Sequence, residues 1–401
     1  MPLRGAQSSP SGVAQLPAEY RDPPPFAVAA QGHELTFYPA GADRFDRLLA
    51  LIDWATVSIR MCFYIFADDR SGRAVIERLL AARRRGVEVS LLIDSFGSNA
   101  TSEAVFAPLV QAGCRYCCFS ARWGVRYLIR NHQKIVVIDG RVGMVGGFNV
   151  ENDYFAPPEA NGWHDLAVEI EGPIVADLLR WYDVIEKWTR RRKGAWKAIR
   201  RLVRAWNPGN GPVKLLLGGP TRGLSPWARA VSDDLIAGDR LDMVMAYFSP
   251  AVRLLARIGR IAKKGQTRLL LAAKSDNGAT IGASRLLYGK LLKKGARIWE
   301  FSPCKLHTKL IVLDDAVYVG SANFDMRSLY INLEIMLRIE DAELAERMRE
   351  FVDQQLPASQ EISREFHRRR RTLLNRIRWT LSWFLVSVVD YTVSRRLNFG
   401  L

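Results

Sequence analysis

The sequence predicts an α/β fold in which one unit of strands and helices occurs twice. The pattern His-x-Lys-x-x-x-x-Asp appears in NHQKIVVIDG at 131–140 and again in KLHTKLIVLDD at 305–315. The matching His, Lys and Asp each lie 175 positions apart, and the chain has only five histidines. Lys and Asp each fill roughly one position in twenty of an average protein, so chance does not account for both matches. The constant offset therefore indicates an internal duplication.

The first copy reads as alternating strands and helices. The apolar, β-rich stretches 56–66 and 87–94 predict strands, and the helical spacing of 71–86 ends at a glycine. The Asp139-Gly140 pair predicts a hairpin turn, and 165–172 predicts a further strand.

The second copy follows the same order. Residues 240–250 match the first strand, 251–265 match the helix, and 267–276 match the second strand. Two copies of one α/β unit can pack about a pseudo-twofold axis, as the subunits of a homodimer do. Such packing would place the two equivalent histidines together, with the active site between the units.

Composition divides the chain into five segments. Residues 1–26 are rich in Pro, Ser, Gly and Ala and contain no apolar core of the signal-peptide kind. No stretch approaches the ~20 apolar residues of a membrane-spanning helix. We expect a poorly ordered tail at 1–30, the first unit at 31–188, a basic Trp-rich linker at 189–212, the second unit at 213–345 and a basic amphipathic tail at 346–401.

The charge points to a polyanionic partner. The chain has 58 Lys and Arg against 41 Asp and Glu, a net charge of +17. Such a balance is typical of proteins that bind nucleic acid or an anionic membrane, although charge can also serve solubility alone. Of the five cysteines, Cys114, Cys117 and Cys118 cluster without the spacing of a zinc site. Reduced thiols are the interpretation we favour, and they fit a cytosolic compartment.

The doubled motif provides the chemistry of phosphoryl-type transfer. Side chains alternate along a strand, so His132 and Lys134 share a face, as do His307 and Lys309. Two facing pairs offer a nucleophile, a general acid and two cationic clamps, which suits a covalent phosphohistidine intermediate. Neither a metal ion nor another cofactor is required, because lysines can neutralise the non-bridging oxygens.

Further residues accompany each copy. A lone histidine is more often structural than catalytic, but the repetition of these companions favours catalysis. The aspartates Asp139 and Asp314 complete the predicted catalytic set, although their place at hairpin turns favours a role in shaping the site. Either Asp165 or Glu334 can orient an imidazole through its second nitrogen. The residues predicted to bind the substrate phosphate are Gly147, Asn149, Ser321 and Asn323.

The doubled motif, with GGFN and GSANFDMRS following its copies, resembles the phospholipase D superfamily. The stretches YIFADDRSG, RRRGVEVSLLIDSFGS, GWHD and AYFSP are similar to bacterial cardiolipin synthases. The C-terminal tail resembles that of the shorter cardiolipin synthases, which lack N-terminal membrane spans. The resemblance runs from about residue 34 to residue 345. It implies two phospholipase D-like α/β sandwich units, with His132 as nucleophile and His307 as acid and base. The motif itself does not order the two histidines.

Two segments outside the repeats indicate a membrane surface. In 196–206, Trp196, Ile199, Val203 and Trp206 alternate with basic residues at helical spacing. In the tail, four arginines at 368–371 precede the uncharged run 379–389, which is too short to cross a bilayer. The alternative is that both are ordinary basic helices packed on the protein.

The resemblance and these segments together predict a peripheral enzyme on the cytoplasmic side of a bacterial cell membrane. It would transfer a phosphatidyl group from phosphatidylglycerol to a second phospholipid hydroxyl. The alternatives are a hydrolytic phospholipase D, a phosphodiesterase acting on nucleic acid, and a non-catalytic lipid-binding scaffold. Nucleic acid is not the partner we expect, because the basic residues gather outside the repeats rather than among stacking aromatics. The acceptor lipid and the oligomeric state are left open.

Overall fold

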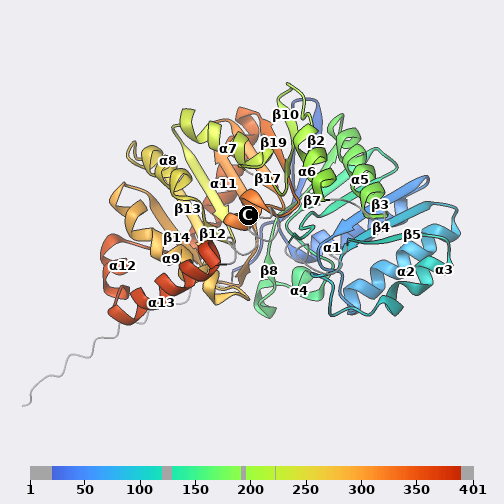
Figure 1. Ribbon diagram of the computed structural model, residues 1–401, viewed down its shortest axis with the longest axis horizontal. Helices are drawn as coiled ribbons and strands as arrows, with labels where there is room; N and C mark the ends of the chain where they lie inside the picture. Colours follow the sequence, from blue (N-terminus) through green and yellow to red (C-terminus); the bar gives the residue numbers. More distant parts are fainter. Residues whose placement is uncertain (1–19, 120–128, 191–195, 222, 390–401) are drawn as a thin grey trace, which may run out of the picture.

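A computed structural model describes residues 20–119, 129–190, 196–221 and 223–389. Two mixed sheets of eight strands each form its framework, one in each half of the chain (Figure 1). The first sheet has the order β1-β2-β9-β7-β6-β3-β4-β5, and the second has β10-β19-β17-β16-β11-β13-β14-β20. Apart from the edge strands β1 and β20, the two orders correspond strand for strand, which confirms the predicted α/β fold and its duplication.

The first half contains the first sheet and the helices around it. Its strands are β1 (Phe26–Ala30), β2 (His33–Tyr38), β3 (Ser58–Phe63), β4 (Glu88–Asp94), β5 (Arg115–Phe119), β6 (Ile135–Ile138), β7 (Val142–Gly146), β8 (Trp163–His164) and β9 (Ala167–Glu171). Its helices are α1 (Gly41–Trp54), α2 (Arg70–Arg84), η1 (Glu103–Phe106), α3 (Ala107–Gln111), α4 (Asn152–Phe155), η3 (Pro158–Ala160), α5 (Ile174–Arg190) and α6 (Trp196–Ala205).

The second half repeats this arrangement and adds helices at its C-terminal end. Its strands are β10 (Val213–Gly218), β11 (Leu241–Met245), β12 (Phe248–Ser249), β13 (Thr267–Ala272), β14 (Arg297–Phe301), β15 (Lys305–Leu306), β16 (Lys309–Leu313), β17 (Ala316–Gly320), β18 (Phe324–Asp325), β19 (Glu334–Glu340) and β20 (Ser359–Glu361). Its helices are α7 (Pro226–Ala237), α8 (Val252–Ala262), α9 (Gly278–Lys293), α10 (Met326–Tyr330), α11 (Ala342–Gln355), η4 (Leu356–Ala358), α12 (Arg364–Arg370), α13 (Leu373–Phe384) and the π-helix η5 (Leu385–Val389).

The layers follow from the apolar faces of these elements. The central core joins the inner faces of both sheets with the buried sides of α5 and α11. Helices α1 to α4 cover the outer face of the first sheet, and α7, α8 and α9 cover that of the second. Because strands β3, β4 and β5 are parallel, as are β11, β13 and β14, their carboxyl ends gather at one edge of each sheet. The site described below lies at this edge.

The predicted N-terminal tail at 1–30 is wrong in its last residues. Phe26–Ala30 forms β1, which pairs antiparallel with β2. Tyr20 and Asp22 reach further into the protein, where the Tyr20 hydroxyl donates to Gln355 and Asp22 accepts from His164 at 2.7 Å. Residues 1–19 lie outside the described residues.

The predicted amphipathic helix in the linker exists as α6, but its apolar side is not free to meet a membrane. Ile199 and Val203 are fully buried in the central core. The Trp206 indole donates to the carbonyl of Leu215 at 2.8 Å. This side of α6 therefore packs on the protein, which corrects the prediction of an interfacial helix; linker residues 191–195 lie outside the described residues.

The predicted boundary of the C-terminal tail at 346 is also wrong. Helix α11 runs through it, and its Met348, Phe351 and Val352 are buried in the central core. Strand β20 then adds an eighth strand to the second sheet. The basic, amphipathic part of the tail begins only at α12, and residues 390–401 lie outside the described residues. Among the described residues, none of the helices combines the length and apolar character needed to cross a bilayer.

Candidate active site

A cavity of about 490 Å³ is lined by residues of both halves. His132 and Asn149 line it from the first half, and His307 and Asn323 line it from the second. The duplication thus brings the two motif histidines to one space, as the pseudo-twofold packing predicted.

Each histidine lies in an extended segment just before a central strand, and the other half of the molecule holds its main chain. The N–H of His132 donates to the carbonyl of Leu333 at 2.9 Å, and the N–H of His307 donates to the carbonyl of His164 at 2.8 Å. Short β8 extends the second contact by pairing in parallel with β15. These main-chain hydrogen bonds fix the position of each histidine relative to the opposite half.

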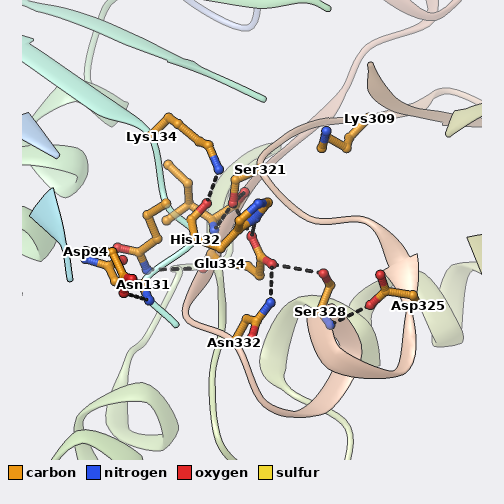
Figure 2. A network of polar contacts seen from close by, with 12 residues as sticks. Asp94, Asn131, His132, Lys134, Lys309, Ser321, Asp325, Ser328, Asn332 and Glu334 are labelled. Carbon is orange, nitrogen blue, oxygen red and sulfur yellow. Dashed lines mark hydrogen bonds and ion pairs between the residues drawn. The ribbon is translucent and has the colours of Figure 1, made fainter. Parts of the chain in front are cut away.

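Glu334, at the start of β19, contacts the first histidine. Its Oε2 lies 3.0 Å from Nδ1 of His132 and accepts from the Ser321 hydroxyl at 2.5 Å. Its Oε1 accepts from the Ser328 hydroxyl at 2.9 Å and faces the Asn332 amide at 3.4 Å. Figure 2 shows this carboxylate at the centre of the network, and it is fully buried. A buried carboxylate with four hydrogen-bond partners is held in a fixed position.

Asp165 makes the corresponding contact to the second histidine. Its Oδ2 lies 2.7 Å from Nδ1 of His307. Tyr154 and Trp163 pack edge-on against the same imidazole, and the Tyr154 hydroxyl is 3.5 Å from Nε2. Behind Asp165, the fully buried Arg44 guanidinium donates to its main-chain carbonyl at 2.6 Å. Each imidazole therefore contacts a carboxylate from the opposite half.

Burial makes both imidazoles weak bases. Removal from water lowers the pKa of His132 to about 4 and that of His307 to about 3. The neighbouring carboxylates oppose this shift, because a negative charge favours the imidazolium form. At neutral pH and without an anion in the cavity, both rings are neutral.

The two motif lysines lie behind the histidines. The Lys134 ammonium donates to the carbonyl of His132 at 2.8 Å (Figure 2), and Lys309 donates to the carbonyl of His307. Neither is among the residues that line the cavity. Burial lowers the pKa of Lys134 to about 7 and that of Lys309 to about 8. The two lysines therefore contribute positive electrostatic potential to the cavity from behind the histidines, without lining it.

Two of the residues predicted to bind the substrate phosphate, Ser321 and Gly147, lie against the carboxylates of Glu334 and Asp165. The Ser321 hydroxyl donates its hydrogen bond to Glu334, and Ser321 is fully buried. A Cβ at Gly147 would lie 2.6 Å from both carboxylate oxygens of Asp165. Neither residue lines the cavity. In this geometry the small residue of each copy makes room for, or bonds to, a carboxylate, and the contact of Gly147 and Ser321 with the substrate phosphate stays a prediction.

The motif aspartates lie at the far ends of β6 and β16, away from the cavity. Both adopt left-handed backbone, with φ of 54° at Asp139 and 50° at Asp314. Asp139 accepts main-chain bonds from Val57 at 2.8 Å and Ser58 at 2.7 Å, and Asp314 accepts one from Arg240 at 2.8 Å. Neither aspartate lines the cavity, and the turn-shaping role that the hairpin position favoured fits this geometry.

Sequence reasoning missed several residues around the cavity. Two guanidinium groups, those of Arg130 and Arg327, line it. The Tyr64 ring packs edge-on against His132, with centroids 4.9 Å apart. Buried Asp94 accepts from the N–H of Asn131 at 2.7 Å (Figure 2) and so fixes the segment that carries His132. Their proximity to the motif in sequence, in RNHQK and NFDMRS, was a usable signal for the arginines.

The comparisons with known proteins agree with this geometry. The family described as "Cardiolipin synthase, PLD-like domain" matches residues 48–184 and 236–356. Cardiolipin synthase A of Pseudomonas putida (strain GB-1) is 30% identical over 82% of this chain and 70% of its own length. Cardiolipin synthase A of Pseudomonas syringae pv. syringae (strain B728a) is 31% identical over the same shares of the two chains.

A solved structure shows a similar fold. Phosphatidylserine synthase of Haemophilus influenzae Rd KW20 superposes with a TM-score of 0.68, at 16% identity, over 93% of this chain and 97% of that one. At this identity the likeness concerns the fold alone.

Proposed function

The chain belongs to the phospholipase D-like family of the cardiolipin synthases and is a phospholipid phosphatidyltransferase, and we propose that it makes cardiolipin. The donor would be phosphatidylglycerol, the acceptor the hydroxyl of a second phospholipid, and the by-product glycerol. One observation carries the proposal: two imidazoles on one cavity, each bonded at Nδ1 to a buried carboxylate. This leaves both Nε2 atoms available for an attack and a proton transfer.

In the first step, Nε2 of His132 attacks the donor phosphorus. The P–N bond forms as the P–O bond to glycerol breaks, and His307 gives its proton to the departing glycerol oxygen. In the second step, His307 takes the proton of the acceptor hydroxyl, whose oxygen attacks phosphorus and releases His132. Each histidine ends in its starting form, so protons and bonds balance over the cycle.

The pKa shifts suit these roles. A pKa of about 4 keeps His132 neutral, and a neutral nitrogen is the nucleophile. His307 must be protonated when the donor is bound, and the negative charge of the phosphodiester raises its pKa toward that state. We assign attack to His132 because its side chain is 12% exposed, against 5% for His307.

The surrounding cations and amides would stabilise the pentacoordinate phosphorus. Arg130, Arg327, Asn149 and Asn323 line the cavity, and the lysines add charge from behind. Buried Oδ1 of Asn323 has no hydrogen-bond partner among the described residues, so the protein does not saturate this amide at the cavity wall. Fixed donors and charges at the point where charge develops account for much of such catalysis.

We also propose that α13 holds the enzyme on an anionic membrane. One face of α13–η5 exposes Leu373, Leu374, Ile377, Leu381, Phe384 and Leu385 at helical spacing. The other side packs on α9, where a Cβ at Gly282 would lie 2.6 Å from the Ser382 hydroxyl. Leu385 and Val386 continue this segment to the wall of the active-site cavity. Insertion of the apolar face would thus place the cavity at the lipid surface, on the cytoplasmic side of a bacterial membrane.

The test is incubation of the purified protein with phosphatidylglycerol vesicles, followed by mass spectrometry of the lipids. We expect cardiolipin, glycerol in equal amount, and no cardiolipin from His132→Ala or His307→Ala. Phosphatidic acid in place of cardiolipin would show that water is the acceptor and refute the transferase assignment. No lipid product from a folded, vesicle-bound protein would refute phospholipid transfer altogether.

A further inference from the structure

A second cavity, of about 630 Å³, lies between α9, α13 and the start of α8. Its walls are largely apolar and include Val252, Leu255, Leu287 and Trp383. Pockets of about 300–1,000 Å³ are typical of sites that bury a small organic ligand. The active-site chemistry described above does not use this cavity.

The rim of this cavity is cationic. Lys290 and Lys293 of α9 and Arg371 and Arg376 beside and on α13 line it, and all four are exposed. None of its described lining residues is Asp or Glu. Across residues 20–389, with the gaps given above, no carboxylate lies within ion-pair distance of these four side chains. By contrast, the neighbouring Arg285, Arg369 and Arg370 all have a glutamate partner.

An apolar interior below four unpaired cations is complementary to an anionic amphiphile. We propose that this cavity binds one molecule of anionic phospholipid, with the acyl chains against the apolar walls and the phosphate among the cations. A free phosphate would leave the apolar walls exposed to water, whereas a zwitterionic lipid would bring a positive group to the cationic rim. The proposal goes beyond the transfer reaction, because it concerns a lipid that is held and not converted.

The position of the cavity ties this lipid to both α13 and the active site. Met326 lines it, and the next residues on either side, Asp325 and Arg327, line the active-site cavity. Likewise Ser387 lines it, while Val386 lines the active site. A bound lipid would therefore pin α13–η5 between the two cavities and select anionic membranes over neutral ones.

The experiment counts bound lipids by native mass spectrometry and calorimetry on the full chain. The probe is dihexanoylphosphatidylglycerol below its micelle concentration, and His132→Ala blocks turnover. We expect two lipids per chain, one in each cavity. Adding Thr380→Trp, whose larger side chain fills the second cavity from α13, should leave one bound lipid, the one in the active-site cavity. Adding Lys290→Glu with Lys293→Glu should raise the dissociation constant of the lipid in the second cavity at least tenfold.

Matched controls separate the site from general effects. Ile236→Trp adds the same ring at an exposed position on α7, and Arg70→Glu with Arg84→Glu reverses two exposed charges on α2; both should keep two lipids. If the transfer reaction itself is wrong, His132→Ala should bind one lipid and the Thr380→Trp combination none. The proposal is overturned if Thr380→Trp leaves the count unchanged, if dihexanoylphosphatidylcholine binds equally well, or if inorganic phosphate displaces the lipid at equal concentration.

Discussion

The change Glu334→Gln tests whether a carboxylate from the second half activates His132. Glutamine keeps the length and shape of the side chain, so the substitution removes charge and one acceptor without leaving a void. In the native protein Oε2 accepts from Ser321 and faces His132, while Oε1 accepts from Ser328 and Asn332. Either orientation of the new amide turns an NH2 group toward two donors.

The size of the effect depends on which donors meet the NH2 group. If it faces His132, the ring must present a lone pair at Nδ1 and carry its proton at Nε2, where the attack should start. The equivalent change in a serine-protease triad costs about 10⁴-fold in rate. If it faces Ser328 and Asn332, the hydroxyl can turn, and mainly the charge is lost. We therefore expect kcat to fall by about 10²–10⁴-fold, or about 3–5 kcal/mol of barrier.

The assay is cardiolipin formation from saturating phosphatidylglycerol in mixed micelles, with thermal unfolding to check the fold. Glu340→Gln, at the exposed end of the same strand, is the matched control and should retain the native kcat. Ser328→Ala removes one donor to the carboxylate and should cost about tenfold or less. A folded Glu334→Gln enzyme with kcat within threefold of the native value would refute the reasoning.

Three further outcomes are expected. Burial lowers the pKa of His132 to about 4 and that of His307 to about 3, whereas both have the ordinary value of 6.5 in the unfolded chain. Below pH 6.5 the unfolded chain therefore binds more protons, and the free energy of unfolding should fall as the pH drops from about 6.5 toward 4. In thermal melts, the variant with both histidines changed to alanine should show a shallower fall. Leu374→Asp with Leu381→Asp should weaken sedimentation with anionic vesicles at least tenfold yet leave turnover of a monomeric short-chain substrate unchanged, since both side chains are exposed and outside the active-site cavity. Asp139→Ala should cost about 1–3 kcal/mol in denaturant unfolding but keep the kcat of the folded fraction; a selective loss of kcat would show that Asp139 takes part in catalysis.

The duplication could be predicted because it rests on local patterns that recur at a fixed offset. Strands β3 and β4 fall within the stretches predicted for them, and helix α2 begins one residue before its predicted stretch. The pairing of histidines with carboxylates could be predicted only as a choice between Asp165 and Glu334. Which carboxylate meets which ring depends on how the halves pack, and no spacing within one half encodes that contact.

The errors have a common physical cause. Amphipathicity shows that a helix has an apolar side but not what covers it. In α6 that side, with Ile199 and Val203, meets the central core, whereas the outer face of α13, with Leu374, stays exposed. Likewise the composition of Phe26–Ala30 gave no sign that β2 would offer it an edge to pair with. Each outcome depends on tertiary partners.

The two halves are equivalent in fold but not in the surroundings of their histidines, and this difference argues for a division of labour. Glu334, which contacts His132, is saturated by hydroxyl and amide donors, an arrangement that stabilises a charge and fixes a ring. His307 instead has Tyr154 and Trp163 against its ring, with the tyrosine hydroxyl near Nε2. An attacking nitrogen needs a fixed direction and open access, whereas a proton carrier needs a dry pocket in which a bound anion can shift its pKa strongly. The asymmetry that evolved around a duplicated motif therefore favours His132 as the nucleophile and His307 as the acid and base.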